Sequence, residues 1–160
     1  MQKEGLQKKS QYFFKYYTKN FLYFTTVERQ KLQSYLMNVK LDTKEKFTVI
    51  SPNEVTLTAI MTEELCNLLL PYKQKDTPHI VLNMQAVEII DEKGGINLAN
   101  LQQNFYEHNC SFVICSLQPV VEKLLDKMEL LEVMNVTLTE SEACDIVQME
   151  EIERELLSDE

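Results

Sequence analysis

The sequence predicts an α/β domain in which a mainly parallel sheet of about five strands is covered by four helices. Two observations support this fold class. Short apolar runs alternate along the chain with longer segments whose apolar residues recur at helical spacing. In addition, no linker rich in glycine, proline or serine divides residues 37–160, so we expect these residues to form one domain.

A β-hairpin and a helix are the first predicted elements. Residues 47–51 and 54–60 are rich in β-branched side chains and flank Pro52-Asn53, a pair that favours a turn. The following helix is expected to begin at Thr62 as its N-cap, because leucines recur at helical spacing behind it.

The middle of the chain is predicted to alternate buried strands with helices. Continuous apolar runs at residues 79–84 and 111–115 are typical of strands that are buried on both faces. Residues 96–108, which lie between them, are predicted to form a helix. The apolar residues at helical spacing in this segment are Ile96, Leu98, Leu101 and Phe105.

The last third of the chain completes the order ββαβαβαβα. Pro119 suits the first turn of a helix that covers residues 119–128, and a short strand is expected at residues 131–136. Thr139 and Glu142 have the spacing of a capping box at the start of the last helix. We expect the inward face of that helix to consist of Ile146, Met149, Ile152 and Leu156.

Charge divides the chain into two segments. Residues 1–36 carry seven basic and two acidic residues, and residues 11–24 alone hold eight of the fourteen aromatic residues, whereas residues 37–160 are strongly acidic. The formal net charge of −9 argues against a nucleic-acid partner. We hypothesise that Met37 is the native start and that residues 1–36 are a non-native extension. The alternative is a basic, aromatic helix that docks on a membrane surface or a partner.

The cysteines give no sign of a metal or disulfide framework. The four cysteines form no C-x-x-C pair, and only two histidines are present. We therefore expect reduced, buried cysteines, no metal and no cofactor, and a cytoplasmic protein. No run of 18 apolar residues predicts a membrane-spanning helix.

The stretch HIVLNMQAVEIIDEKGG, residues 79–95, places two of the chain's three glycines side by side, shortly after an aspartate. It resembles the signature of STAS domains, a family that includes anti-sigma factor antagonists and the tails of sulfate transporters. In that signature, two hydrophobic stretches separated by Asp or Asn precede Asp-Ser-Ser/Thr-Gly-Leu at the start of a helix. The matching positions here are Ile80, Val81, Leu82, Asn83, Val87, Ile90, Asp91 and Gly94.

A second stretch supports the same resemblance. QPVVEKLLDKMELLEV is similar to the family's Pro-x-Val-x-x-x-Leu/Phe segment through Pro119, Val121 and Leu125. The resemblance covers roughly residues 45–155, including the order of the elements, and it implies the STAS fold.

The departures from the family pattern concern regulation and partner contacts. In family members that are controlled by phosphorylation, the first serine after the aspartate receives phosphate from a kinase that is also the anti-sigma factor. That position here is Glu92, followed by Lys93, so there is no hydroxyl to phosphorylate at the usual position. Gly95 replaces the usual leucine, and Glu129 replaces a glycine.

Glu92 has three interpretations that the sequence leaves open. In the first, Asp91 is the N-cap and Glu92 complements the helix dipole by about 0.3–1 kcal/mol, while Gly94 permits tight packing. In the second, Glu92 mimics the phosphorylated state, although a phosphate carries nearly two charges. In the third, the protein is an antagonist that is never switched off and is recognised by its shape around Gly94-Gly95.

The residues favour a binding protein over an enzyme. Asp91 and Glu92 are sequence neighbours, which do not face each other on a helix and so form a poor acid–base pair. No G-x-S-x-G motif, P-loop or G-x-G-x-x-G motif occurs. His108 and Cys110 are close in sequence but have no third group to orient them, so Cys110 is interpreted as a core residue.

We therefore expect a non-enzymatic regulator that resembles an anti-sigma factor antagonist. Its expected partner is an anti-sigma factor of the kinase type or a signalling assembly. The predicted contact loop is Asp91, Glu92, Lys93, Gly94 and Gly95. The predicted contact face of the following helix is Asn97, Asn100, Gln103 and Asn104, and Asn83 is expected to support the loop. The alternative function is an accessory subunit of a membrane transport system, such as one for phospholipid trafficking.

Overall fold

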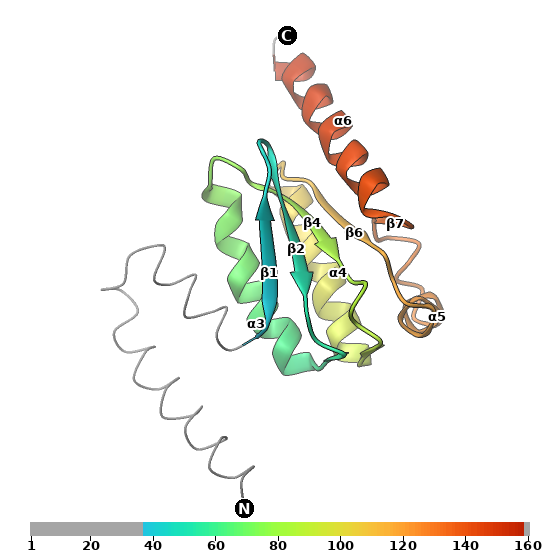
Figure 1. The fold of residues 1–160 in the computed structure, drawn as a ribbon. Helices are drawn as coiled ribbons and strands as arrows, with labels where there is room; N and C mark the ends of the chain where they lie inside the picture. Colours follow the sequence, from blue (N-terminus) through green and yellow to red (C-terminus); the bar gives the residue numbers. More distant parts are fainter. Residues whose placement is uncertain (1–36, 159–160) are drawn as a thin grey trace, which may run out of the picture. The chain divides into compact units, whose positions relative to one another are not determined.

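The computed structural model describes residues 37–158 (Figure 1). The predictions for residues 1–36 lie outside the described residues. The described strands are β1 (Val39–Thr43), β2 (Phe47–Pro52), β3 (Thr56–Leu57), β4 (His79–Asn83), β5 (Ile89–Ile90), β6 (Phe112–Cys115) and β7 (Val136–Thr137). The helices are α3 (Ala59–Leu69), the 3-10 helix η2 (Leu70–Gln74), α4 (Glu92–Glu107), α5 (Pro119–Lys127) and α6 (Glu140–Ser158).

The main sheet has five strands in the order β1-β2-β4-β6-β7. β1 is antiparallel to β2, and every other pair in this sheet is parallel. β3 and β5 form a separate two-stranded parallel sheet. The predicted α/β fold, with a mostly parallel sheet and four α-helices among the described residues, is therefore confirmed.

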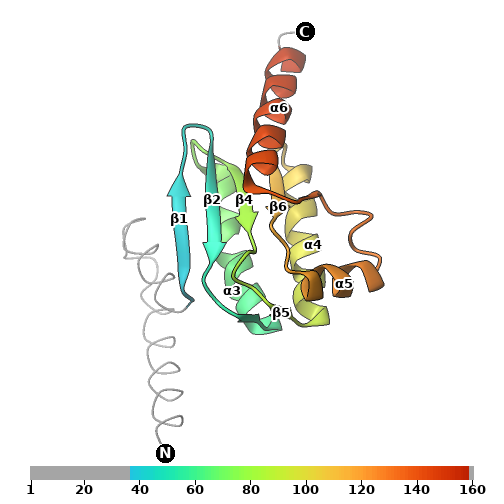
Figure 2. The same cartoon turned by 45° about the vertical axis from the view of Figure 1, so that its right-hand side comes forward.

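Helices cover both faces of the main sheet. α3 and α4 pack on one face and α6 on the other, as Figures 1 and 2 show together. Ile80 and Leu82 of β4 belong to the larger apolar core, whereas Val81 between them packs with Ala143 and Val147 of α6. Because β4 and β6 are buried on both faces, their sequences are continuous apolar runs rather than alternating patterns.

The predicted hairpin and the start of the first described helix are wrong. β2 pairs with β1, a strand in a segment where the sequence predicted no element. Only Thr56–Leu57 of the second predicted strand forms a strand, and it pairs with β5. The helix begins at Ala59, because the Thr58 hydroxyl accepts a hydrogen bond from the Met61 amide at 3.3 Å as N-cap. Thr62 is buried inside the helix.

The last third agrees with the sequence in its capping and differs in its packing. The capping box is confirmed: the Glu142 amide donates to Thr139 Oγ1 at 3.2 Å, and the Thr139 amide donates to the Glu142 carboxylate at 3.3 Å. The strand expected at residues 131–136 is wrong, because only Val136–Thr137 pairs in the sheet.

The expected inward face of α6 is also wrong. Ala143 and Val147 are the buried residues of this helix, and Ile146 is partly buried beside them. The other three expected core residues are exposed, with fractions of 61% for Met149, 53% for Ile152 and 67% for Leu156. No helix among residues 37–158 is both long enough and apolar enough to cross a membrane.

A polar cluster fixes the rotation of α6 about its axis. His79, which is 4% exposed at the start of β4, accepts a hydrogen bond at Nδ1 from the Ser111 amide at 2.9 Å. Its Nε2 lies 2.6 Å from the Glu151 carboxylate, so the neutral ring donates there. Arg154 Nη2 donates to Ser111 Oγ at 2.8 Å. Ser111 Oγ also hydrogen-bonds the Glu150 carboxylate. These contacts turn the charged side of α6 toward the sheet.

The same cluster extends to α4. The Tyr106 hydroxyl donates to Glu150 at 3.0 Å and accepts from Asn135 Nδ2 at 2.9 Å. Burial raises the pKa of Tyr106 to about 12, so the phenol stays protonated as a donor. Gln102 also links α4 to the main sheet, because its side-chain Nε2 donates to the Phe112 carbonyl of β6 at 2.7 Å.

His79 is expected to make the protein less stable in mild acid. Burial lowers the pKa of His79 below its ordinary value of 6.5, more than the facing Glu151 and Glu150 carboxylates raise it; the facing Arg154 lowers it further. The unfolded chain therefore binds a proton below about pH 6.5 that the folded protein does not bind. The free energy of unfolding should fall as the pH drops from 7.5 to 5.5, by at most about 1.4 kcal/mol per pH unit.

Urea denaturation at several pH values measures this loss of stability. His79→Gln should flatten the decline with falling pH, whereas His108→Gln, at an exposed histidine, should leave it unchanged. Equal slopes for the two variants would contradict the role given to His79.

Candidate functional site

Asp91 joins the N-termini of two helices. Its Oδ1 accepts a hydrogen bond from the Gly94 amide at 2.6 Å, which makes it the N-cap of α4. Its Oδ2 accepts from the Ala59 amide at 2.7 Å, in the first turn of α3. One carboxylate thus meets free N–H groups at the positive ends of two helix dipoles. The sequence predicted the first of these roles and not the second.

The adjacent glycines allow close packing on two sides of the loop. A Cβ atom added to Gly94 would lie 2.9 Å from Asp91 Oδ1, 3.0 Å from Ile90 Cγ1 and 3.3 Å from Thr62 Cγ2. A Cβ added to Gly95 would lie 2.9 Å from Leu125 Cδ2 on α5. Because Gly94 has no side chain, the N-cap of α4 can pack closely against α3. For the same reason, Gly95 lets α4 pack closely against α5.

Glu92 and Lys93 are the exposed residues of the predicted contact loop, together with Asp91. Glu92 is the first residue of α4, where its negative charge complements the helix dipole. Lys93 Nζ lies 3.3 Å from the Glu63 carboxylate on α3. Both side chains are well exposed, so this ion pair adds little to stability.

Exposed apolar side chains lie on the segments that meet at this loop. Ile89 precedes Ile90 and Asp91, and its amide donates to the Val55 carbonyl at 3.0 Å. Ile60 follows Ala59, the residue that Asp91 binds. The exposed residues of this group, which we call the apolar rim, are Val55, Ile60, Ile89 and Ile96. No pattern in the sequence marked this rim: Ile96 shares the helical spacing of Leu98 and Leu101, which are buried, but it is 44% exposed.

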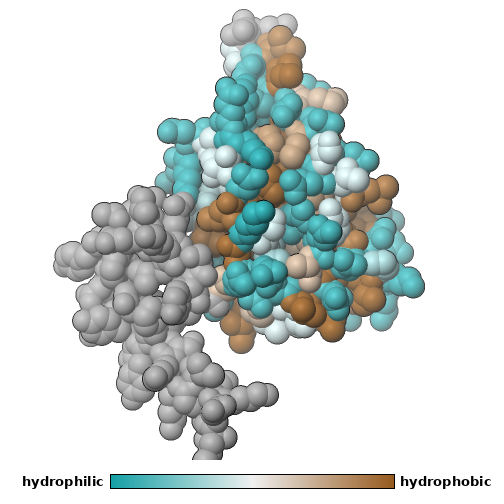
Figure 3. Space-filling model, in the orientation of Figure 1, coloured by the Kyte–Doolittle hydropathy of each residue, from teal (hydrophilic) through white to brown (hydrophobic). Residues whose placement is uncertain are grey.

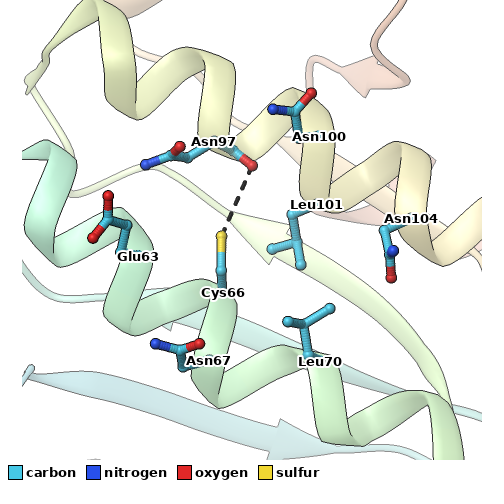
Figure 4. A pocket seen from close by; sticks show the side chains of 8 residues that line it. All are labelled: Glu63, Cys66, Asn67, Leu70, Asn97, Asn100, Leu101 and Asn104. Carbon is cyan, nitrogen blue, oxygen red and sulfur yellow. Dashed lines mark hydrogen bonds between the residues drawn. The ribbon is translucent and has the colours of Figure 1, made fainter.

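A shallow groove of about 420 Å³ runs between α3 and α4 (Figure 4). Leu70 and Leu101 point toward each other within it, and the Cys66 thiol lies 3.8 Å from the Asn97 carbonyl oxygen. Four asparagine side chains and one glutamate surround this apolar centre. These polar residues are Glu63, Asn67, Asn97, Asn100 and Asn104.

The predicted contact residues on α4 divide between this groove and the solvent. Asn97 Nδ2 donates to Thr62 Oγ1 at 3.0 Å, so this side chain holds α4 to α3. Asn104 accepts a hydrogen bond from Lys73 at the edge of the groove. Asn100 lines the groove and is exposed. Gln103 is exposed and donates to Glu107 at 3.2 Å along the helix.

Asn83 contacts a different part of the structure from the one predicted. Its Oδ1 accepts from the Gln85 amide at 3.0 Å, and its Nδ2 donates to Glu140 at 2.6 Å. Neither hydrogen bond reaches residues 91–95, so Asn83 connects the end of β4 to the start of α6.

Cys110 and Cys115 are buried as predicted, whereas Cys66 and Cys144 are only partly buried beside the core. All four are free, and burial raises the pKa of each thiol, for Cys66 and Cys115 to about 11. A nucleophilic cysteine needs a lowered pKa, so this environment opposes thiolate chemistry. Among residues 37–158, no group of three or more histidine, cysteine, aspartate or glutamate side chains could hold a metal ion.

Comparison with known proteins identifies the fold. A family model described as the STAS domain matches residues 38–143. A protein described as an anti-sigma factor antagonist from Thermotoga maritima is similar in structure, with a TM-score of 0.62 and 18% identity over 72% of this chain and 97% of that chain. The anti-sigma factor antagonist SpoIIAA in its unphosphorylated form gives a TM-score of 0.56 and 19% identity over 69% and 96% of the two chains.

A transporter contains the same fold as part of a longer chain. Murine Slc26a9, an anion transporter, gives a TM-score of 0.55 and 14% identity over 68% of this chain and 18% of that chain. No curated protein sequence matches the chain. The family match extends from β1 to the first turn of α6, which is most of the described domain. The chain therefore belongs to the STAS domain family.

Proposed function

We propose that residues 37–160 form a non-enzymatic regulator of the anti-sigma factor antagonist type, which binds an anti-sigma factor of the kinase type through residues 91–95. The observation that carries the proposal is the position of Glu92 and Lys93. They are exposed at the point where Asp91 fixes the first turns of two helices, and the apolar rim lies on the segments that meet there. Exposed apolar side chains can form the centre of an interface, and charged residues beside them can form its polar edge.

The contacts of Asp91 bear on the role of Glu92. Capping of α4 is already provided by Asp91, so the Glu92 carboxylate is free to meet a partner. The N-terminus of α4 stabilises the negative charge of Glu92, and it would stabilise a phosphate group at this position for the same reason. The proposal is that Glu92 is a constitutive contact, and the phosphate-mimic interpretation predicts a different outcome in the experiment below.

The experiment measures the affinity of the full chain for purified kinase-type anti-sigma factors from the same cell. Three proteins are compared with the unsubstituted chain: Glu92→Ser, Glu92→Arg and Glu107→Arg. Glu107 is a matched control because it is an exposed glutamate at the opposite end of α4. Biolayer interferometry at fixed ionic strength gives the dissociation constants.

If Glu92 is a constitutive contact, the unsubstituted chain binds and Glu92→Arg weakens binding by about tenfold or more, whereas Glu107→Arg does not. If Glu92 mimics a phosphorylated state, only Glu92→Ser binds. Failure of all four proteins to bind any such partner would contradict the proposed function.

A transport accessory subunit is the second candidate, and the similarity to part of the anion transporter Slc26a9 favours it. In this case the chain binds a membrane permease or its ATPase rather than an anti-sigma factor. Purification of the tagged chain from detergent-solubilised membranes, followed by identification of its partners, distinguishes the two functions. The neighbouring genes provide a second check, because a sigma factor and its kinase or a permease and its ATPase are expected there.

A further inference from the structure

The solvent-facing side of α6 carries a stripe of exposed apolar side chains. We call Met149, Ile152 and Leu156 the outer stripe. Their spacing of three and then four residues places them on one side of the helix, nearly opposite the buried Ala143 and Val147. Figures 1 and 2 show the C-terminal half of α6 extending beyond the strands, and apolar atoms gather at this end in Figure 3.

Acidic residues flank the outer stripe. When Met149, Ile152 and Leu156 occupy the a, d and a positions of a heptad, Glu153 and Glu155 occupy the e and g positions beside them. Charges at e and g positions select the partner of a paired helix. The whole helix contains seven acidic residues and one basic residue, Arg154, which faces the sheet.

A hollow lies next to the stripe. It has a volume of about 500 Å³ and lies between Gln148 and Ile152 of α6 and residues 44–47, which lead into β2. Phe47, which is 5% exposed, contributes to its lining. Lys44, Glu45 and Lys46 also line the hollow, so it forms a mixed, largely polar border of the stripe, and the stripe itself is the apolar contact surface.

We infer that the outer stripe docks an amphipathic helix of a partner protein whose apolar side is flanked by lysine or arginine. The charge of Glu153 selects this occupant, because Glu153 forms no ion pair among residues 37–158, whereas Glu155 pairs with Lys46 at 2.8 Å. A second copy of α6 would bring Glu153 against glutamates of the same kind, which is destabilising. An anionic membrane surface would repel the same residues.

The outer stripe is separate from residues 91–95. The start of α6 lies near the C-terminal end of β4, where Glu140 binds Asn83. Its later part lies near the N-terminal ends of the strands, where Glu155 binds Lys46 at 2.8 Å and Glu151 binds His79. Residues 91–95 follow β5 at the start of α4, so the docked helix and a partner at that loop occupy different ends of the sheet. This inference does not depend on the proposed function.

The test uses the full chain and two synthetic helical peptides. One peptide has leucine at its a and d positions and lysine at e and g, and the other is identical except for glutamate at e and g. Fluorescence anisotropy measures their dissociation constants at physiological salt. We expect the lysine peptide to bind at least about tenfold more tightly than the glutamate peptide.

Substitutions locate the binding surface. Leu156→Glu should weaken binding of the lysine peptide by about tenfold or more, whereas Val133→Glu, at another exposed apolar residue, should not. Glu153→Lys should also weaken binding, whereas Glu132→Lys, with the same change of charge at another exposed site, should not. Leu156 and Glu153 are exposed, so these variants should fold, and circular dichroism checks that they do.

Three results would overturn the inference. The first is no binding of either peptide, or equal loss of affinity in Leu156→Glu and Val133→Glu. The second is a dimer in sedimentation velocity that Leu156→Glu dissociates, which would identify a second copy as the occupant. The third is binding to vesicles containing phosphatidylglycerol that depends on Leu156, which would identify a membrane.

Discussion

Replacing Arg154 with methionine is expected to lower the free energy of unfolding by about 2–3 kcal/mol. Arg154 Nη2 donates to Ser111, and the guanidinium lies 3.6 Å from the Glu150 carboxylate and 3.5 Å from the Glu151 carboxylate. Without the guanidinium, the partly buried carboxylates of Glu150 and Glu151 lose their positively charged partner and lie beside the neutral ring of His79. The three charged side chains are 24–26% exposed, so the expected loss is smaller than for a fully buried ion pair.

Guanidinium chloride denaturation at pH 7.5 measures this loss. Lys123→Met is the matched control, because it removes a positive charge from an exposed position on α5 and should change stability by less than about 0.5 kcal/mol. A change no larger than that of the control would show that the cluster does not stabilise α6.

Replacing Gly95 with valine is expected to destabilise the protein by about 2 kcal/mol. The Cβ atom alone would lie 2.9 Å from Leu125 Cδ2 and 3.5 Å from Leu130 Cδ1. Leu125 is fully buried, so it has little space into which to move. The larger side chain must therefore push α4 and α5 apart.

Asn100→Val is the control for Gly95→Val, because it introduces the same β-branched side chain at an exposed position of the same helix. Thermal and chemical denaturation should show a loss for Gly95→Val that is clearly greater than the loss for Asn100→Val. Similar losses would mean that helix propensity, and not the contact with α5, determines the cost at position 95.

The glycine at position 95 also accounts for one departure from the family pattern. The STAS signature that the sequence resembles has leucine at this position. Here Leu125, Leu130 and Met128 occupy the space that a larger side chain would need. The change is therefore compensated by packing on α5 and in the turn after it, so it does not leave a gap at the loop.

The central part of the fold could be predicted because its signals are local. β4 and β6 are short, continuous apolar runs, which are typical of central strands that are buried on both faces. Both strands lie where the sequence predicted them. Asp91 caps α4 because an aspartate before a helix can accept from the amide three residues later. Short-range hydrogen bonds of this kind are set by neighbouring residues alone.

The edges of the fold depended on pairing between distant residues. β1 is half-exposed at the edge of the sheet, so its sequence lacks the apolar run of a central strand. Thr56–Leu57 becomes a strand through pairing with Ile89–Ile90. Likewise, the second hydrogen bond of Asp91 reaches Ala59, 32 residues earlier in the chain. No local pattern marks such pairs.

The sequence by itself determined that residues 140–158 form a helix, through the capping box at Thr139 and Glu142. It also predicted one inward face, made of Ile146, Met149, Ile152 and Leu156. Only the tertiary structure decided which side faces the sheet. His79 and Ser111 bind Glu151, Glu150 and Arg154, and these contacts turn Ala143 and Val147 inward. Because buried polar groups must find partners, this polar cluster outweighed the larger apolar residues, which remain exposed as the outer stripe.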